Sequence, residues 1–265
     1  MGSATREASE SSRAALAALG STADLATGEG LFSAARVVGG SHQLRAALSD
    51  NSADPAAKAA LVGAVFGSSL TPSALQLMKA VVAAKWSSQN DLLAGIEDLG
   101  LRAVAMSGQD AGVIEAELFS FGTTVSSDAG LELALASKLG KAESKAALVE
   151  NLLAGKVAPQ TLVVMRHLVQ QPRGRRIGEL LRYAASVISD QSGYSVATVT
   201  SARPLAPAQL NRLKANLSGR YGRALTLNLV IDPAVVGGVR VQIGDDVIDG
   251  SVASRLSDLR LQLAG

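Results

Sequence analysis

The chain has 265 residues, of which 48% are hydrophobic and only 3% aromatic, and its formal net charge at pH 7 is +2. It contains no cysteine, which excludes disulfides, thiolate metal sites and a cysteine nucleophile. Because Ala and Leu are abundant and large aromatic side chains are scarce, the composition predicts a mostly helical protein whose helices pack closely.

The apolar stretches are too short to cross a membrane. LVGAVF from Leu61 and LVVM from Leu162 are among the longest, whereas a membrane-spanning helix needs roughly 18 to 20 apolar residues. We therefore expect no direct membrane insertion, and any association with a membrane to come through a partner protein.

The N-terminal part of the chain is duplicated. A shift of 87 residues without a gap aligns LFSAARVV from Leu31 with LFSFGTTV from Leu118, and KAALV from Lys58 with KAALV from Lys145. Each copy is too long for a solenoid repeat and has the size of a small helical bundle. We predict two tandem helical bundles, the first in residues 1–109 and the second in residues 110–190.

Several helices can be placed within the copies. Asp54-Pro55 and Thr71-Pro72 each set a capping side chain before a proline at the first helical position. Apolar residues then recur at the spacing of one buried helix face. These residues are Leu75, Met78 and Val82 in the first copy and Leu162, Met165 and Val169 in the second.

From Tyr194 the pattern changes to that of a small α+β domain, residues 191–265. Alternation predicts strands around Val196 to Thr200, from Leu225 to Ile231 and from Val239 to Ile243. A helix is expected near Pro207, and a second one after Gly250 with Ser251 as its cap. The predicted order is β-α-β-β-α, and the fold class is mostly α with this α+β domain at the C-terminus.

One segment near the C-terminus carries a long, ordered motif. Paired glycines precede an alternating strand, and paired acids follow it in the run that leads to SVASRL. Such glycines suggest a bend, or a backbone φ that other residues adopt only at a cost. This pattern resembles the signature of the F-type ATP synthase δ subunit family, in its long actinobacterial form. The residues that carry the resemblance are Asp232, Val236, Gly237, Gly238, Val239, Val241, Ile243, Gly244, Asp249 and Gly250.

The resemblance implies a non-catalytic subunit of the peripheral stalk of a proton-translocating ATP synthase. In that family a helical bundle holds the N-terminal segment of an α subunit, the C-terminal domain holds the C-terminal segment of b, and other subunits of the catalytic head are neighbours. The expected location is the cytoplasmic face of the bacterial cell membrane. The family normally has one bundle, and the sequence leaves open which copy binds α.

No catalytic, cofactor or metal site is predicted from the residues. His42 and His167 align with Ala129 and Ala80 in the other copy, so neither histidine recurs, and both are interpreted as ordinary helix or loop residues. Asp245 and Asp246 are interpreted as a tight turn between strands. Neither GxxxxGK[ST] nor GxGxxG occurs, which argues against a phosphate-binding loop.

The alternative is a free-standing helical interaction protein or a nucleic-acid adaptor. Binding to phosphates needs clustered cations, and the cluster that the chain offers is Arg173, Arg175 and Arg176 in QPRGRRIG. We interpret these arginines as solvated charges at a helix connection, and contact with an acidic partner surface is the second possibility. Nucleic acid is therefore not an expected partner.

Overall fold

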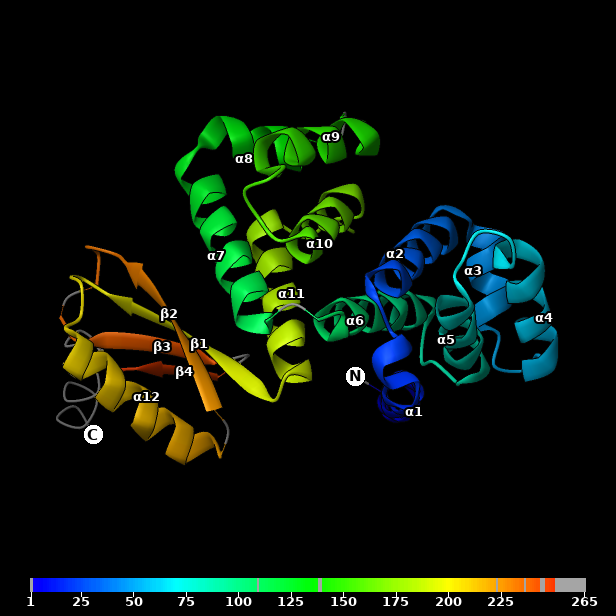
Figure 1. Cartoon of the computed structure of the whole chain (residues 1–265), viewed down its shortest axis with the longest axis horizontal. Helices are drawn as coiled ribbons and strands as arrows, with labels where there is room; N and C mark the ends of the chain where they lie inside the picture. Colours follow the sequence, from blue (N-terminus) through cyan, green and yellow to red (C-terminus); the bar gives the residue numbers. More distant parts are fainter. Residues whose placement is uncertain are drawn as a thin grey trace, which may run out of the picture. The chain divides into compact units, whose positions relative to one another are not determined.

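The computed structural model describes residues 2–108, 110–137, 140–222, 224–235, 237–243 and 246–250 (Figure 1). Their contacts divide the chain into two compact units, Met1–Ile188 and Ser189–Gly265. The first unit is helical and the second contains a small sheet, which confirms the predicted fold class. Both predicted copies lie within the helical unit, so their separation into two domains at residue 109 stays a prediction.

The helices of the first copy begin where capping side chains were expected. Asp54 accepts a hydrogen bond from the backbone N–H of Ala56, and Thr71 accepts one from that of Ala74, with a proline next in each helix. The helices are α1 (Ser3–Leu19), the short 3-10 helix η1 (Gly20–Thr22), α2 (Leu25–Gly40), α3 (His42–Ser49), α4 (Pro55–Phe66), α5 (Pro72–Ala83) and α6 (Gln89–Met106).

The helices of the second copy repeat those of the first in register. A shift of 87 residues moves α3, α4 and α5 residue for residue onto the helices that follow α7, and moves α2 onto α7 with one residue of difference at its start. The second copy therefore repeats the helices of the first copy, as the sequence duplication predicted. Its helices are α7 (Ala111–Ser127), α8 (Ala129–Ala136), α9 (Ala142–Leu153), α10 (Pro159–Gln170) and α11 (Ile177–Gln191).

Helix α6 belongs to both copies. The same shift moves α1 onto residues 90–106, which is all of α6 except its first residue, and moves α6 onto α11. One side of α6 contributes Ile96 and Leu99 to the core of the first copy, and another contributes Leu101 and Val104 to the core of the second. Residues 99–105 are accordingly all buried, as expected for a helix with neighbours all round. Figure 1 shows α6 between the two bundles.

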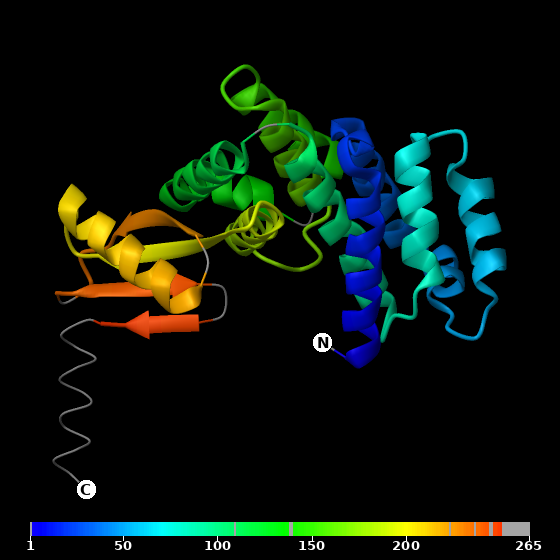
Figure 2. The same ribbon diagram turned by 60° about the horizontal axis from the view of Figure 1, so that its bottom comes forward.

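The C-terminal unit is a four-stranded mixed sheet with a helix on one face (Figure 2). The strand order is β2-β1-β3-β4, in which β1 is parallel to β2 and antiparallel to β3, and β3 is antiparallel to β4. Leu217 of the helix packs with Val199, Leu225 and Val241 of the sheet. The elements are β1 (Tyr194–Ser201), α12 (Pro207–Tyr221), β2 (Ala224–Ile231), β3 (Val239–Ile243) and β4 (Asp246–Asp249).

Strand β4 was not predicted. Asp246, interpreted as part of a tight turn, is its first residue and pairs with Ile243 of β3. The strand has only four residues and an aspartate at each end, so its intrinsic β-propensity is low, and pairing with β3 decides its structure. Asp245 and the helix predicted after Gly250 lie outside the described residues.

Candidate functional site

The signature residues of the C-terminal unit form a turn followed by a β-hairpin. After β2, the carboxylate of Asp232 accepts a hydrogen bond from the backbone N–H of Ala234 at 2.9 Å. Gly237 and Gly238 then have φ angles of 65° and 77°. Residues other than glycine rarely adopt such φ angles, so the paired glycines allow the chain to turn into β3. Val236 and Gly244 are outside the described residues.

Strand β3 of the hairpin has one apolar and one polar face. Val241 is buried, while Arg240 on the opposite face is exposed and pairs with Asp249 of β4 at 2.8 Å. The backbone N–H of Gly250 donates to the carbonyl of Val239 at 3.0 Å, and a Cβ atom on Gly250 would lie only 3.1 Å from that oxygen. The described signature residues thus form the turn after β2 and the hairpin of β3 and β4. Their role as a family signature stays a prediction.

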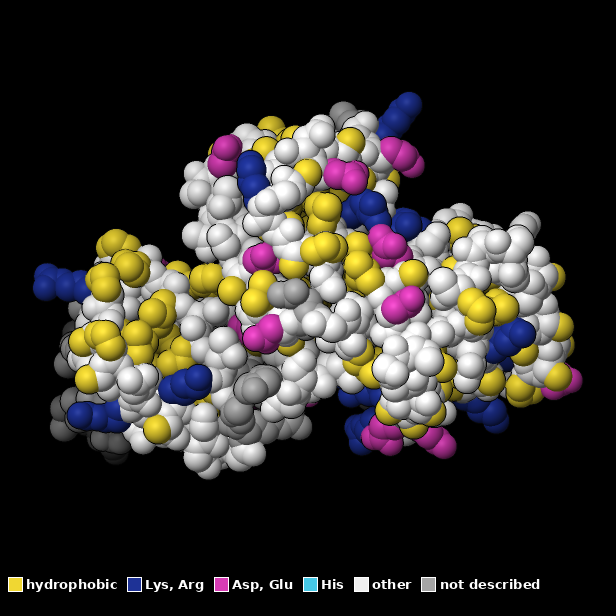
Figure 3. Space-filling model, viewed as in Figure 1, with side chains coloured by type: hydrophobic (Ala, Val, Ile, Leu, Met, Phe, Trp, Pro, Cys, Tyr) yellow, Lys and Arg dark blue, Asp and Glu magenta, His cyan; other side chains and the backbone are white. Residues whose placement is uncertain are grey.

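The sheet exposes two apolar side chains near the end of β2. Leu229 is paired in register with the buried Val199 and lies on the same face of the sheet, yet 39% of Leu229 and 55% of Ile231 are exposed. In Figure 3 apolar side chains gather over the sheet on the face shown. The exposed end of β2 is a candidate docking surface for a partner.

The two histidines lie in different surroundings. His42 is the first residue of α3. His167 of α10 is buried and stacks on the ring of Phe32 from α2, with ring centroids 4.1 Å apart. Burial, followed by the charges of Arg36, Arg175 and Arg173, lowers the pKa of His167 to about 3. His167 is therefore neutral at pH 7.

A buried carboxylate lies beside His167. We call Glu97, His167, Arg173 and Arg175 the Glu97 cluster. The Arg173 Nη1 atom lies 2.7 Å from Glu97 Oε2, and Arg175 Nη2 lies 3.7 Å from the same oxygen. Only 6% of the Glu97 side chain is exposed, and this burial raises its pKa although Arg173 and Arg175 act in the opposite direction.

The Glu97 cluster corrects the interpretation of the arginines. Arg173 and Arg175 were expected to be solvated or to contact a partner, but both contact Glu97 of the same chain, and Arg176 alone of the three is exposed. Arg173 also donates to the backbone carbonyl of Asn90 at 3.1 Å. Sequence reasoning missed this pairing because Glu97 belongs to a helix 76 residues earlier in the chain.

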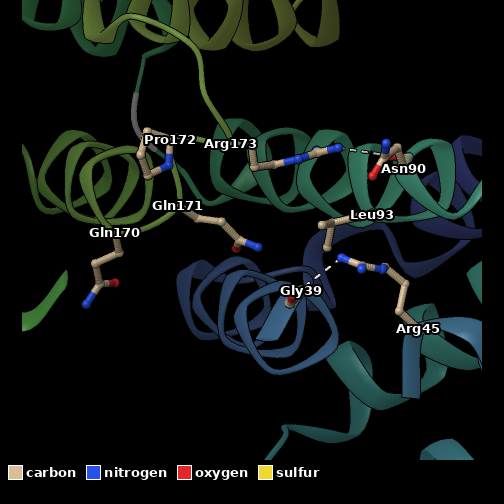
Figure 4. Close-up of a pocket in the computed structure, with 8 residues that line it drawn as sticks. All are labelled: Gly39, Arg45, Asn90, Leu93, Gln170, Gln171, Pro172 and Arg173. Atoms are coloured by element: carbon tan, nitrogen blue, oxygen red, sulfur yellow. Dashed lines mark hydrogen bonds between the residues drawn. The ribbon is translucent and has the colours of Figure 1, made fainter. Parts of the chain in front are cut away.

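A polar pocket of about 490 Å³ lies next to the Glu97 cluster (Figure 4). Its arginines already have partners, because Arg45 donates to the carbonyl of Gly39 at 3.4 Å and Arg173 to that of Asn90. The lining residues are Gly39, Arg45, Asn90, Leu93, Gln170, Gln171, Pro172 and Arg173. Within the described ranges, no group of three or more His, Cys, Asp or Glu side chains could hold a metal ion.

One face of the molecule carries charged side chains of both signs. On the face shown in Figure 3, Lys and Arg side chains are interspersed with Asp and Glu side chains. That distribution does not resemble the basic stripe of a nucleic-acid-binding surface. Among the helices that the structure describes, none is both long enough and apolar enough to cross a membrane.

Comparisons with known proteins agree on one family. The model of the ATP synthase delta (OSCP) subunit family matches residues 101–263. The "ATP synthase subunit delta" of Leifsonia xyli subsp. xyli is 56% identical over 265 residues, which is 100% of each chain. The protein of the same name from Kineococcus radiotolerans is 40% identical over 242 residues, 90% of this chain and 88% of the relative. That from Thermobifida fusca is 36% identical and covers 90% of each chain.

The family match and the relatives differ in what they cover. The family model begins at residue 101, within α6, and so covers the second copy and the C-terminal unit. The relative from Leifsonia xyli aligns over its full length and therefore has a counterpart of the first copy too. The first copy is thus an addition to the part that the family model describes.

Proposed function

The chain belongs to the ATP synthase δ (OSCP) family, and from this premise we propose that it acts as a stator in a proton-translocating ATP synthase. In this role it is a non-catalytic subunit of the peripheral stalk that holds the catalytic head to the membrane-anchored b subunits while the rotor turns. The observation that supports the proposal most is the 56% identity with an ATP synthase subunit delta over the whole chain.

The two units then divide the work of a connector. The helical unit holds the N-terminal segment of an α subunit, since a helical bundle offers grooves into which an amphipathic helix can dock. The C-terminal unit holds the C-terminal segment of b, and the exposed apolar residues Leu229 and Ile231 support this assignment. The chain works at the cytoplasmic face of the bacterial cell membrane, where it is attached through b and beside other subunits of the head.

We assign the binding of α to the second copy. This copy is directly followed by the C-terminal unit and lies within the residues that the family model matches. It also exposes Val113, Leu133 and Leu152, and 72% of Leu133 is accessible. Two of the positions 87 residues earlier are alanines, Ala26 and Ala46, and the third is Val65. Among the described residues, the large apolar side chains that the first copy exposes are Val37 and Val65, so the exposed leucines that a partner helix could contact belong to the second copy.

Binding of two labelled peptides to the full-length chain tests the proposal. One peptide carries the N-terminal segment of α and the other the C-terminal segment of b from the same organism. A chain with Val113→Ser, Leu133→Ser and Leu152→Ser is compared with a matched control that has Ala26→Ser, Ala46→Ser and Val65→Ser. We expect the second-copy variant alone to lose binding of the α peptide, and both variants to keep binding of the b peptide.

Each other outcome contradicts a stated part of the proposal. Loss of α binding in the first-copy control would place the α site on the first copy. Failure of the parent chain to bind either peptide would contradict the stator function itself. Salt-sensitive binding to DNA or RNA without binding of either peptide would support the nucleic-acid adaptor instead.

A further inference from the structure

The two bundles are joined first by a continuous helix. Because α6 contributes side chains to the cores of both copies, the copies are joined through a shared helix. Any bend between the bundles at residues 99–105 of α6 would have to break backbone hydrogen bonds in a stretch where every residue is buried. The joint is therefore stiff along the chain.

A second connection lies away from the chain path, between α2 of the first copy and α10 of the second. Phe32 of α2 is part of the apolar core of the second copy and stacks on His167. Next to it, Arg166 Nη2 of α10 lies 2.7 Å from Glu29 Oε1 of α2. Gln171 donates to the backbone carbonyl of Ala35 at 3.2 Å. One copy thus supplies an aromatic side chain to the core of the other.

The Glu97 cluster adds a buried ion pair to this second connection. Arg173 reaches α6 from the segment between α10 and α11, where it binds both the carboxylate of Glu97 and the carbonyl of Asn90. Figure 4 shows the Arg173 side chain extended toward Asn90. Its backbone has a φ of 50°, which is uncommon for a residue other than glycine. Opening the joint would leave the buried Glu97 charge without its closest partner.

Three residues of the Glu97 cluster are not repeated at the corresponding positions of the first copy, although Phe32 recurs as Phe119. Positions 87 residues before His167, Arg173 and Arg175 hold Ala80, Trp86 and Ser88. Glu97 corresponds to Glu10, which is exposed on α1. The duplication alone therefore does not account for the second connection, since it uses side chains that only the joint between the copies possesses.

We propose that the first copy serves as a rigid brace for the second. The shared helix α6 and the contact between α2 and α10 hold the bundles at two separate places, so that residues 2–188 behave as one stiff body under load. In this assignment the added copy gives the connector stiffness and does not act as a second binding domain. Its use within the ATP synthase rests on the proposed function, whereas the stiffness is a property of the chain alone.

The absence of cysteine allows a direct test on the full-length chain. Spin labels are attached to Val65→Cys on α4 and Leu133→Cys on α8, two exposed positions in different copies. Pulsed electron paramagnetic resonance then measures the distribution of distances between the labels. We expect one narrow distribution, and a broad or multiple distribution in the otherwise unchanged chain would overturn the proposal.

Variants test whether the second connection, which comprises the contacts between α2 and α10 and the Glu97 cluster, contributes to the stiffness. Glu97→Ala should lose the single narrow distribution, while the matched control Glu10→Ala, at the corresponding exposed position, should keep it. Where circular dichroism shows that Glu97→Ala has lost helix, Arg166→Ala replaces it, with Lys79→Ala as its control, because Arg166 is half-exposed and its loss leaves no buried charge. A narrow distribution in the folded joint variant would refute the role of these contacts.

The result is independent of peptide binding. A chain that binds neither α nor b could still be stiff, and a chain that binds both could still bend at the joint. Failure of the brace and failure of the stator function are therefore distinguished by separate measurements.

Discussion

Replacing Arg173 by glycine sets two effects against each other at one residue. Arg173 has a φ of 50°, so glycine would relieve backbone strain. The same change removes the guanidinium group that lies 2.7 Å from Glu97 Oε2 and also binds the carbonyl of Asn90. An account based on strain alone predicts a more stable protein, whereas an account based on the buried ion pair predicts a less stable one.

The magnitudes favour the ion pair. Relief of a left-handed backbone conformation is worth about 1–2 kcal/mol, and the greater freedom of glycine in the unfolded chain offsets about 0.5–1 kcal/mol of it. Removal of one partner from a buried ion pair costs about 3–5 kcal/mol. We reduce that cost to about 2 kcal/mol because Arg173 is 21% exposed and Arg175 remains 3.7 Å from the carboxylate. The net expectation for Arg173→Gly is a loss of about 1 kcal/mol.

Urea unfolding at pH 7 measures this difference. Trp86 is the single tryptophan of the chain and is buried in the first copy, so its fluorescence follows that copy, while far-UV circular dichroism follows all helices. Arg173→Ala provides the comparison, because alanine loses the ion pair and keeps the strained backbone. We expect the free energy of unfolding to fall in the order parent, Arg173→Gly, Arg173→Ala. A glycine variant as stable as the parent would refute the reasoning.

Two further predictions concern pH and the C-terminal unit. The pKa of His167 is about 3 in the folded protein, against an ordinary histidine value of 6.5, so the folded protein excludes a proton that the unfolded chain binds. Stability from His167 is therefore complete above pH 6.5 and is lost as the pH falls toward 3. The raised pKa of Glu97 has the opposite effect on stability as the pH falls. His167→Gln should reduce the loss of unfolding free energy between pH 7 and 4. An unchanged pH profile of the unfolding free energy would contradict the buried neutral state of His167. Gly238→Val places a β-branched residue at a φ of 77° and should destabilise the C-terminal unit by about 1–2 kcal/mol. Hydrogen exchange of the β3 amides measures this effect, with Gly219→Ala in α12 as the control, and equal exchange in both variants would argue against a required positive φ.

The local features of this fold were predictable, and the contacts between distant elements were not. The gapless shift and the caps at Asp54 and Thr71 indicated helices of the second copy and helix starts of the first, because these signals act within a few residues. The pairing of Arg173 with Glu97 depends on how α6 packs against the segment after α10, and neither local sequence reports that packing. Strand β4 was missed for the same reason, since its pairing with β3 overrides a weak local preference.

The overlap at α6 also limits how the protein can be cut and recombined. A domain boundary placed before α6 removes one of the helices that cover the core of the first bundle. A boundary placed after α6 removes one from the second bundle. The natural module is therefore a period of 87 residues, which contributes five helices to a bundle and shares the sixth helix with the neighbouring bundle. Engineering that shortens or lengthens this protein by whole periods would keep six helices in each bundle, whereas excision of an apparently complete bundle would expose the apolar core of its neighbour to solvent.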